Sequence, residues 1–217
     1  MSDKKVIEYI HGDLYGVALE VTKKWVAKSE MRPVLTYTRH QINGTMTATD
    51  SHRMIEIRNM HGFEDEYLIN PKTFVAATGQ YPDTTQLASK DGTHAAIALT
   101  KDQIKLWLQM FKSIGQTMKA LKMSIKNKIV TMSFDDSASH VTIELKEQDL
   151  KLSLPGIIDK PSFDKIAFNV EYMRDAMEAH VKLQSEQVIF YMQSPMRPII
   201  MDNDKNVTAL ILPVRVY

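Results

Sequence analysis

The spacing of hydrophobic residues in the last third of the chain predicts one helix set among short strands. Apolar residues recur at three- and four-residue intervals after Asn169, a residue type that caps helices. The residues that share this face are Met173, Ala176, Met177, His180 and Val181. Runs rich in β-branched and aromatic residues surround the helix and end at turn-forming residues. The predicted strands cover residues 165–168, 187–193, 198–201 and 207–216, so the order is β-α-β-β-β.

The same order occurs in the middle of the chain. Residues 95–99 form a predicted strand, and Thr100 is placed to cap the helix that follows. The apolar face of this helix consists of Ile104, Trp107, Leu108 and Phe111. The three strands expected after it cover residues 122–125, 129–134 and 141–145, with polar turns between them.

A third copy of the pattern begins near the start of the chain. Residues 5–10 form a predicted strand, and Asp13 is the expected helix cap. The helix face is formed by Leu14, Val17, Ala18, Val21 and Trp25. Strands are expected over residues 34–38, 45–49 and 54–58, and the Asn43–Gly44 pair predicts a hairpin turn between the first two.

A fourth unit is abbreviated. Residues 66–70 are strand-like, and Pro71 starts a predicted short helix over residues 71–78. A polar stretch over residues 86–94 follows the turn signal at Tyr81–Asp83 and predicts a domain boundary. The prediction is therefore an α+β fold of β-α-β-β-β repeats, with helices on one face of antiparallel sheets. Residues 1–90 form one domain, truncated in its second half, and residues 91–217 form a complete one.

Net charge, cysteine content and the length of apolar runs limit the classes of protein to which this chain can belong. The 217 residues include 27 Lys and Arg against 26 Asp and Glu, so the net charge is only +1 and nucleic-acid binding would need a local basic face. The absence of cysteine excludes disulfides, Cys-based zinc sites and a Cys nucleophile. Neither a secretory leader nor a membrane-spanning run is apparent. These features predict a cytoplasmic globular protein.

No constellation of residues predicts catalysis. The sequence contains no phosphate-binding glycine loop, no nucleophile elbow, no pair of carboxylates with an evident partner and no histidines at metal-ligand spacing. We therefore expect a protein that is not an enzyme and that needs no metal or cofactor.

The polar faces of the three predicted helices carry cations. These are Lys23, Lys24 and Lys28 on the first helix, Lys101, Lys105 and Lys112 on the second, and Arg174 and Lys182 on the third. Solvated lysines are the ordinary explanation for each helix taken alone. Several such helices on one surface would instead bind phosphates without reading sequence. The acidic residues Glu171, Asp175 and Glu178 on the third helix weaken this second interpretation.

Three segments resemble one known family. Residues 48–54 resemble the Ala-Thr-Asp-Gly-His-Arg-Leu segment of bacterial sliding clamps, the β subunit of the replicative DNA polymerase. Residues 79–87 resemble the Gly-x-Phe-Pro-Asp-Tyr stretch at a domain junction of that family. Residues 209–216 are similar to its C-terminal Tyr-Val-Val-Met-Pro-Met-Arg-Leu. The three segments occur in the family's order on the repeat described above.

The resemblance implies a ring around duplex DNA, with helices inside and sheets outside, that tethers a polymerase without reading bases. The eight helix cations would then face DNA. Partners would dock short linear peptides in an apolar pocket. By correspondence with the family, the pocket residues are Thr49, Ser51, His52, Arg53, Met54, Pro82, Gln86, Leu87, Pro195, Arg197, Leu210, Ile211, Leu212, Pro213, Val214 and Arg215. The last strand is equally consistent with an ordinary core strand.

The sequence departs from the family in ways that bear on the ring. Ser51 and Gln86 stand where the family has Gly and usually Arg. The family's first domain has no counterpart, and the second is shortened. Ring closure would need three chains of four units or four chains of three. Two hypotheses stay open: a shortened, phage-like clamp that forms a homo-oligomer on DNA, and a ringless module that keeps the peptide pocket and regulates replication.

Overall fold

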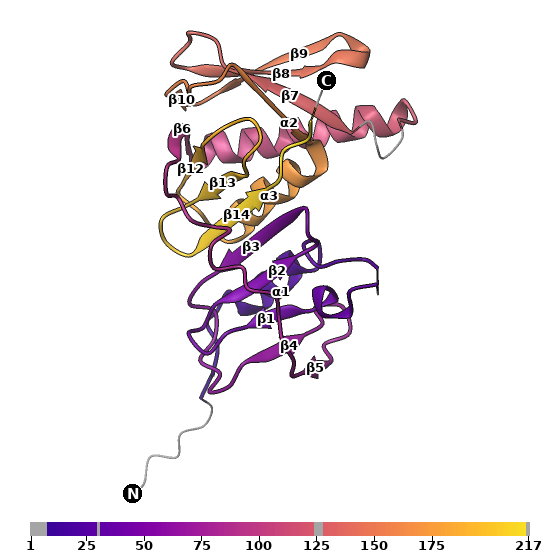
Figure 1. Cartoon of the computed structure of the whole chain (residues 1–217), viewed down its shortest axis with the longest axis vertical. Helices are drawn as coiled ribbons and strands as arrows, with labels where there is room; N and C mark the ends of the chain where they lie inside the picture. Colours follow the sequence, from indigo (N-terminus) through magenta and orange to yellow (C-terminus); the bar gives the residue numbers. More distant parts are fainter. Residues whose placement is uncertain (1–7, 30, 124–127, 216–217) are drawn as a thin grey trace, which may run out of the picture.

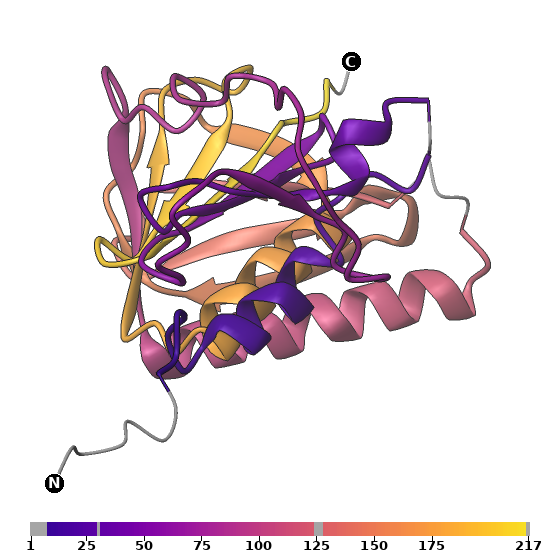
Figure 2. The ribbon, with the colours of Figure 1, turned by 90° about the horizontal axis from the view of Figure 1, so that it is seen from below.

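A computed structural model describes residues 8–29, 31–123 and 128–215. In these residues, three α-helices lie beside one another on one side of the molecule, and antiparallel sheets form the other side (Figures 1 and 2). This arrangement confirms the predicted α+β class with helices on one face of the sheets. Within the described residues, no helix is long and apolar enough to span a bilayer.

The C-terminal part contains two complete units that exchange their first strands. The first unit consists of β6 (His94–Thr100), α2 (Lys101–Ala120), β7 (Ile129–Ser133), β8 (His140–Leu145) and β9 (Leu150–Pro155). The second unit consists of β11 (Lys165–Asn169), α3 (Val170–Lys182), β12 (Gln187–Met192), β13 (Ile199–Asp202) and β14 (Val207–Ile211). Strand β6 pairs with β12 of the second unit, and β11 pairs with β7 of the first. A two-residue strand, β10 (Ile157–Ile158), extends the sheet beyond β6.

The N-terminal part contains one unit and the first strand of another. Its elements are α1 (Tyr15–Thr22), the 3₁₀ turn η1 (Pro33–Thr36), β1 (Thr38–His40), β2 (Met46–Thr49), β3 (Arg53–Ile57), β4 (Tyr67–Ile69) and β5 (Ala76–Ala77). Strand β4 pairs antiparallel with β1, as β6 pairs with β12. The abbreviated fourth unit is thus a first strand that completes the sheet of the unit before it.

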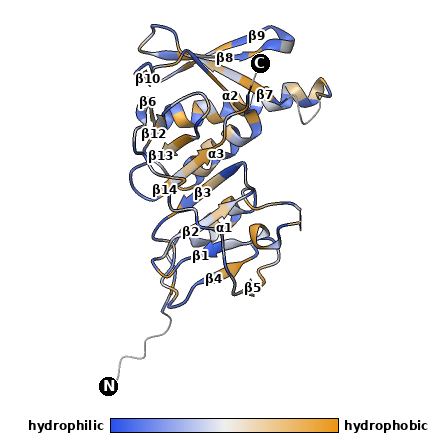
Figure 3. Ribbon diagram, in the orientation of Figure 1, coloured by the Kyte–Doolittle hydropathy of each residue, from blue (hydrophilic) through white to orange (hydrophobic). Residues whose placement is uncertain are grey.

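The two parts share one sheet and one core. Strand β3 pairs with β14 over five residues, from Arg53↔Ile211 to Val207↔Ile57, and this joins the strands into a ten-stranded sheet. A single cluster of buried side chains extends from Ala18 and Trp25 to Phe190 and Ile211. In Figure 3 the central strand β14 is mostly hydrophobic, whereas α2 alternates between hydrophobic and hydrophilic residues.

The helix ends and faces largely follow the sequence. Thr100 caps α2 in a reciprocal capping box with Gln103, and the Asn169 side chain accepts a hydrogen bond from the Glu171 amide. The predicted apolar faces are buried, although Leu14, Val17 and Val181 are only half-buried. The predicted cap Asp13 is wrong, because α1 begins after Leu14 and has no side-chain cap.

Several predicted elements are wrong. Residues 71–78 form a turn and β5 rather than a helix, because the Asn70 carboxamide accepts the amides of Lys72 and Thr73 and Phe74 adopts a positive φ of 59°. Pro33 starts a 3₁₀ turn where a strand was expected over residues 34–38. Lys122 lies in a turn and Met123 in neither helix nor strand, and β9 is a strand that was not predicted. Residues 8–10 are not a strand, and the last strand ends at Ile211. Residues 5–7, 124–125 and 216, also predicted as strand, lie outside the described residues.

The domain boundary near residue 90 stays a prediction. The described segment over residues 78–93 contains neither helix nor strand and crosses from β5 to β6. It runs over the face of the sheet that is turned away from the helices, so it helps to shape the candidate site described next.

Candidate functional site

The outer face of the ten-stranded sheet, turned away from the helices, carries a row of apolar side chains. Met54, Leu210, Ile200 and Tyr191 occupy neighbouring positions in register on β3, β14, β13 and β12. They form a small cluster separate from the main core, and Ala88 of the crossing segment packs on it. The residues that alternate with them face the helices, because successive side chains of a strand point to opposite faces.

Predicted pocket residues surround this row. Thr49 is the register partner of Met54, and the Leu212 amide donates a hydrogen bond to the His52 carbonyl oxygen at 2.9 Å. Leu87 and Leu212 are 50% and 39% exposed, which is high for leucine and leaves apolar surface beside the row. The strands therefore bring Thr49, His52, Met54, Leu210 and Leu212 together on this side of the molecule.

A cavity of about 590 Å³ lies where the C-terminal segment meets β11. The Val214 amide donates to the Ala167 carbonyl oxygen at 2.8 Å, which holds the segment against the strand. Three predicted pocket residues, Pro195, Val214 and Arg215, line this cavity. Its other lining residues are Thr131, Lys146, Phe163, Asp164, Lys165, Ile166, Ala167 and Met196. A lining that combines apolar side chains with a few charged groups suits a short peptide with hydrophobic side chains.

The remaining members of the predicted set lie at the margins of this surface. Pro82, Gln86 and Arg197 are exposed on loops, and Pro213 is half-buried in the C-terminal segment. Ile211 is completely buried and faces the helices. The structure thus brings most of the set to the outer side and places Ile211 in the core.

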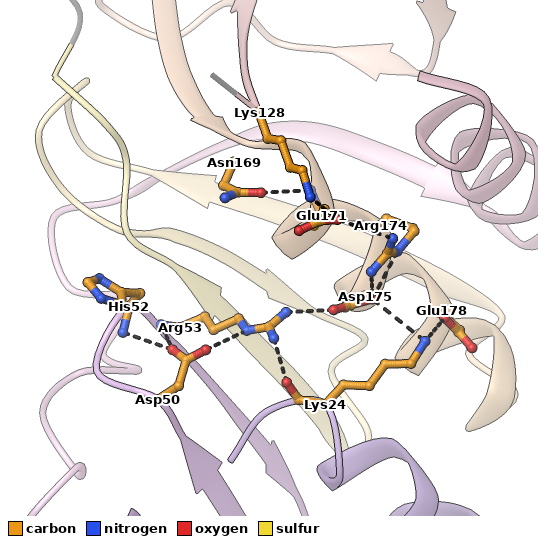
Figure 4. A network of polar contacts seen from close by, with 10 residues as sticks. All are labelled: Lys24, Asp50, His52, Arg53, Lys128, Asn169, Glu171, Arg174, Asp175 and Glu178. Atoms are coloured by element: carbon orange, nitrogen blue, oxygen red, sulfur yellow. Dashed lines mark hydrogen bonds and ion pairs between the residues drawn. The ribbon is translucent and has the colours of Figure 1, made fainter. Parts of the chain in front are cut away.

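Arg53 points away from the outer surface and into the junction between the two parts of the molecule (Figure 4). It is 6% exposed, and its guanidinium donates to Asp50 at 3.0 Å, to Asp175 of α3 at 2.7 Å and to the Lys24 carbonyl oxygen. The rings of Trp25 and Tyr172 lie 5.1 and 4.4 Å from it. Arg53 therefore joins β3 to α1 and α3, and it does not contact a ligand on the outer face.

Ser51 lies at the position where the sliding-clamp pattern has glycine. Its φ is +75°, in the left-handed region where a side chain is strained and glycine is not. The Thr49 hydroxyl accepts the Ser51 amide, and the Asp50 carboxylate accepts the amides of His52 and Arg53. The turn between β2 and β3 thus keeps a geometry that favours Gly, although the chain has Ser.

Most of the predicted DNA-facing cations are neutralised by carboxylates. The ion pairs are Lys23 with Glu20, Lys24 with Asp175 and Glu178, Lys101 with Glu186, Lys105 with Asp102, Arg174 with Asp175, and Lys182 with Glu178. Burial raises the pKa of Glu178, but its hydrogen bonds and charge interactions with Lys24 and Lys182 together outweigh this and hold the pKa below its usual value. Among the described residues, Lys28 and Lys112 have no ion-pair partner.

Unpaired positive charge gathers between α2 and α3. A cavity of about 520 Å³ is lined there by Lys24, Lys112, Gly115, Gln116, Lys119, Lys128, Glu171, Arg174 and Glu178. Lys128 pairs with Glu171 at 2.8 Å, whereas Lys119 has no ion-pair partner among the described residues. Five cations against two carboxylates leave this part of the helix face positive, which favours phosphate groups.

Sequence reasoning missed several residues of both surfaces. Lys119 lies seven positions after Lys112, two helical turns along, so the helical period was a usable signal. Phe163 and Met196 of the outer cavity precede and follow strands, and nothing in the local pattern singles them out. Their role depends on the exchange of β11 between the units, which only the structure reveals.

At the level of sequence, no family model and no curated protein matches this chain. Solved structures do. The DNA polymerase sliding clamp of Bacillus subtilis aligns over all of this chain and 67% of its own, with a TM-score of 0.74 and 22% identity. The chain has the sliding-clamp fold. The β subunit of the DNA polymerase of Streptococcus pyogenes (TM-score 0.69, 17% identity) and a Helicobacter pylori β clamp bound to a DNA ligase peptide (0.67, 15%) also align over the whole chain and 68% and 69% of their own.

The sliding-clamp fold accounts for the layers described above. Over the part of the chain that the structure describes, α1, α2 and α3 lie on one side and the sheets on the other (Figure 2), and the alignment covers all of this chain. The peptide bound to the Helicobacter pylori protein shows that a clamp of this fold accepts such a ligand.

Proposed function

We propose that this chain is a non-enzymatic replication factor of the sliding-clamp type, which contacts duplex DNA through its helix face and docks partner peptides on its outer face. The observation that supports it most is the division of the molecule into two surfaces of different chemistry. One is a helix face with a positive cavity between α2 and α3, and the other is an apolar outer face.

DNA contact is assigned to α2 in particular. Lys112 and Lys119 have no carboxylate partner among the described residues, whereas the cations of α3 are paired with Asp175 and Glu178. Phosphate contacts of this kind release counterions and give affinity that falls steeply with salt and is independent of base sequence.

The DNA test compares two double variants of equal charge. Lys112→Glu with Lys119→Glu should lower retention on closed circular duplex DNA at least tenfold at low salt. Lys151→Glu with Lys205→Glu, which changes the charge equally away from the helix face, should lower it less than threefold. Equal loss in both variants would show that only net charge matters. Equal retention on circular and linearised DNA would show that the protein does not encircle it.

Peptide docking is tested separately, with the DNA ligase peptide bound to the Helicobacter pylori clamp as the probe. Leu212→Asp and Met196→Asp place charge on exposed apolar positions of the outer face. Each should raise the dissociation constant at least tenfold in fluorescence anisotropy, and Glu64→Asp, on an exposed loop, should leave it unchanged. If both variants bind like the parent protein, the outer face is not the docking site.

Peptide binding without any retention on DNA would favour the alternative, a ringless module that binds clamp-binding peptides. This alternative is supported by the ion pairs that carboxylates form with the cations of α1 and α3.

A further inference from the structure

The cavity at the C-terminal segment differs in charge from the apolar row beside it. Its lining includes three basic residues, Lys146, Lys165 and Arg215, and one acidic residue, Asp164. The three cations come from segments far apart in the sequence: the turn after β8, the start of β11 and the C-terminal segment. The fold therefore gathers positive charge at one place in a chain whose net charge is only +1.

This positive charge is left uncompensated within the part of the chain that the structure describes. Among the described residues, Lys146, Lys165 and Arg215 have no ion-pair partner, and all three are exposed. The carboxylate of Asp164 is already paired with Lys160 at 3.4 Å. Carboxylates of a ligand would therefore meet three free cations in this cavity, and such complementarity gives specificity to a contact.

Apolar side chains line the same cavity and indicate which class of acidic ligand fits it. Met196 is 50% exposed, and Phe163 and Val214 are half-buried. A nucleic-acid backbone would cover the cations with phosphates and leave these side chains in water. A peptide can carry carboxylates and apolar side chains together, so it satisfies both parts of the lining.

The C-terminal segment connects the cavity with the apolar row of the outer face. The Leu212 amide bonds the His52 carbonyl oxygen beside the row, and the Val214 amide bonds the Ala167 carbonyl oxygen at the cavity. An extended chain rises about 3.3 Å per residue, so these two attachment points lie within about 7 Å of each other along the segment. A peptide whose apolar side chains lie on the row would thus reach the cations about two to four residues further along.

We propose that this cavity favours peptides with a short acidic run beside their apolar residues, and that Lys146, Lys165 and Arg215 bind the carboxylates. The proposal rests on the peptide docking in the proposed function and deepens it, because it names acidic residues as the feature that distinguishes a partner. Exposed ion pairs are individually weak, so the three cations together should discriminate between acidic and basic peptides by about tenfold.

The first test attaches peptides at the cavity, so it does not depend on prior docking. Met196→Cys introduces a single thiol into a chain without cysteine. Two short cysteine-containing peptides serve as probes, one of leucine and aspartate and one of leucine and lysine. Each exchanges into a mixed disulfide with the protein in the presence of 2-mercaptoethanol, which competes for the thiol. Half-release of the aspartate peptide should need about fivefold more 2-mercaptoethanol than half-release of the lysine peptide.

Two charge reversals in the Met196→Cys background provide matched controls. Lys165→Glu reverses a cation of the cavity and should remove most of the preference for the aspartate peptide. Lys72→Glu makes the same change of charge at an exposed position of the N-terminal part and should preserve the preference. About 1 M salt should weaken it as well, because screening then acts over about 3 Å. Equal conjugation of both peptides, or equal effects of the two reversals, would overturn the proposal.

The second test measures free peptides by fluorescence anisotropy. The probe is the DNA ligase peptide bound to the Helicobacter pylori clamp, extended at either end by three aspartates, three asparagines or three lysines. At low salt the aspartate extension should lower the dissociation constant about tenfold relative to the lysine extension, and at one end only, because the cations lie on one side of the row. Equal affinity of all three forms would overturn the proposal.

The two tests separate this proposal from the proposed function. If no free peptide binds but the tethered aspartate peptide is preferred, the docking proposed above is wrong and the charge preference of the cavity stands. If the free peptides bind with equal affinity and the tethered ones show no preference, docking stands and this proposal is wrong. If Lys165→Glu lowers retention on duplex DNA as much as Lys112→Glu does, the cations of the cavity bind phosphates, which also overturns the proposal.

Discussion

Ser51 has a backbone conformation that is unfavourable for a residue with a side chain. Its φ of +75° suits glycine, and the Arg32 guanidinium bonds its hydroxyl only weakly at 3.3 Å. We expect Ser51→Gly to stabilise the protein by up to about 1 kcal/mol, because relief of the strain exceeds the entropy that glycine adds to the unfolded chain. Urea unfolding measures this. Ser162→Gly, at an exposed residue without positive φ, is the control and should be neutral or destabilising.

Arg53 lies away from the outer face, and we expect its substitution to lower the free energy of unfolding. Its guanidinium is buried against Asp50 and Asp175, so its removal leaves Asp50 without an ion-pair partner among the described residues and takes one of three cations from buried Asp175. Breaking a buried pair from one side costs about 3–5 kcal/mol, and we expect Arg53→Met to lower the free energy of unfolding by that amount. Arg197→Met removes an exposed arginine and should change it by less than about 0.5 kcal/mol. Similar effects of both variants in urea unfolding would contradict this role.

At the scale of elements, the start of α1 is held to the β1–β2 hairpin by aromatic and histidine rings. The Tyr15 hydroxyl lies 3.2 Å from His40 Nε2, and the rings of His40 and His61 are 5.1 Å apart. Burial is the main reason that the pKa of His40 is lowered to about 4, with the neighbouring His61 adding to the effect. His40 is therefore neutral in the folded protein at pH 6, whereas it is half-protonated near pH 6.5 in the unfolded chain.

This difference predicts a loss of stability in acid. As the pH falls from about 6.5 to 4, His40 becomes protonated in the unfolded state but stays neutral in the folded state. The free energy of unfolding therefore falls by up to about 1.4 kcal/mol per pH unit. Buried His180, whose pKa is also lowered to about 4 by burial, acts in the same direction. His40→Gln should make the dependence of unfolding free energy on pH shallower between pH 6.5 and 4.5, and His94→Gln, whose side chain is 42% exposed, should not. An unchanged slope in His40→Gln would count against the assignment.

The elements also show what could be predicted from sequence. Thr100 and Asn169 mark helix starts through local hydrogen bonds, and their caps are confirmed. Apolar and polar residues alternate from Leu150 to Leu154, which is typical of a half-buried strand, although no strand was predicted there. The exchange of β6 and β11 between units could not be predicted, because it depends on contacts between residues far apart in sequence.

The candidate site illustrates a limit of carrying residues over from a resemblance. Arg53 and Met54 are adjacent in a strand, so they face opposite sides of the sheet and cannot both line one pocket. The structure places Met54 in the outer row and Arg53 among the helices. The predicted strand over residues 54–58 began one residue too late, and period-two alternation separates the two side chains only once Arg53 is known to lie in β3.

For the whole molecule, the shared sheet and core argue against two independent parts. Trp25 lies in the N-terminal part and Trp107 in the C-terminal part, and both belong to one buried cluster. The pairing of β3 with β14 and the bonds of Arg53 cross between the parts. An N-terminal part with one helix and one sheet would expose the core side of β3 if it separated, and apolar exposure of this kind is unfavourable.

We therefore expect a single cooperative unfolding transition. Trp25→Phe leaves Trp107 as the only tryptophan, and Trp107→Phe leaves Trp25, so each variant reports on one part. In each variant the fluorescence midpoint in urea should coincide with the midpoint of far-ultraviolet circular dichroism, because neither part keeps its structure when the other unfolds. A Trp25 signal that changes at a lower urea concentration than the circular dichroism would show instead that the N-terminal part opens first. The junction between β3 and β14 would then be a hinge rather than a fixed contact.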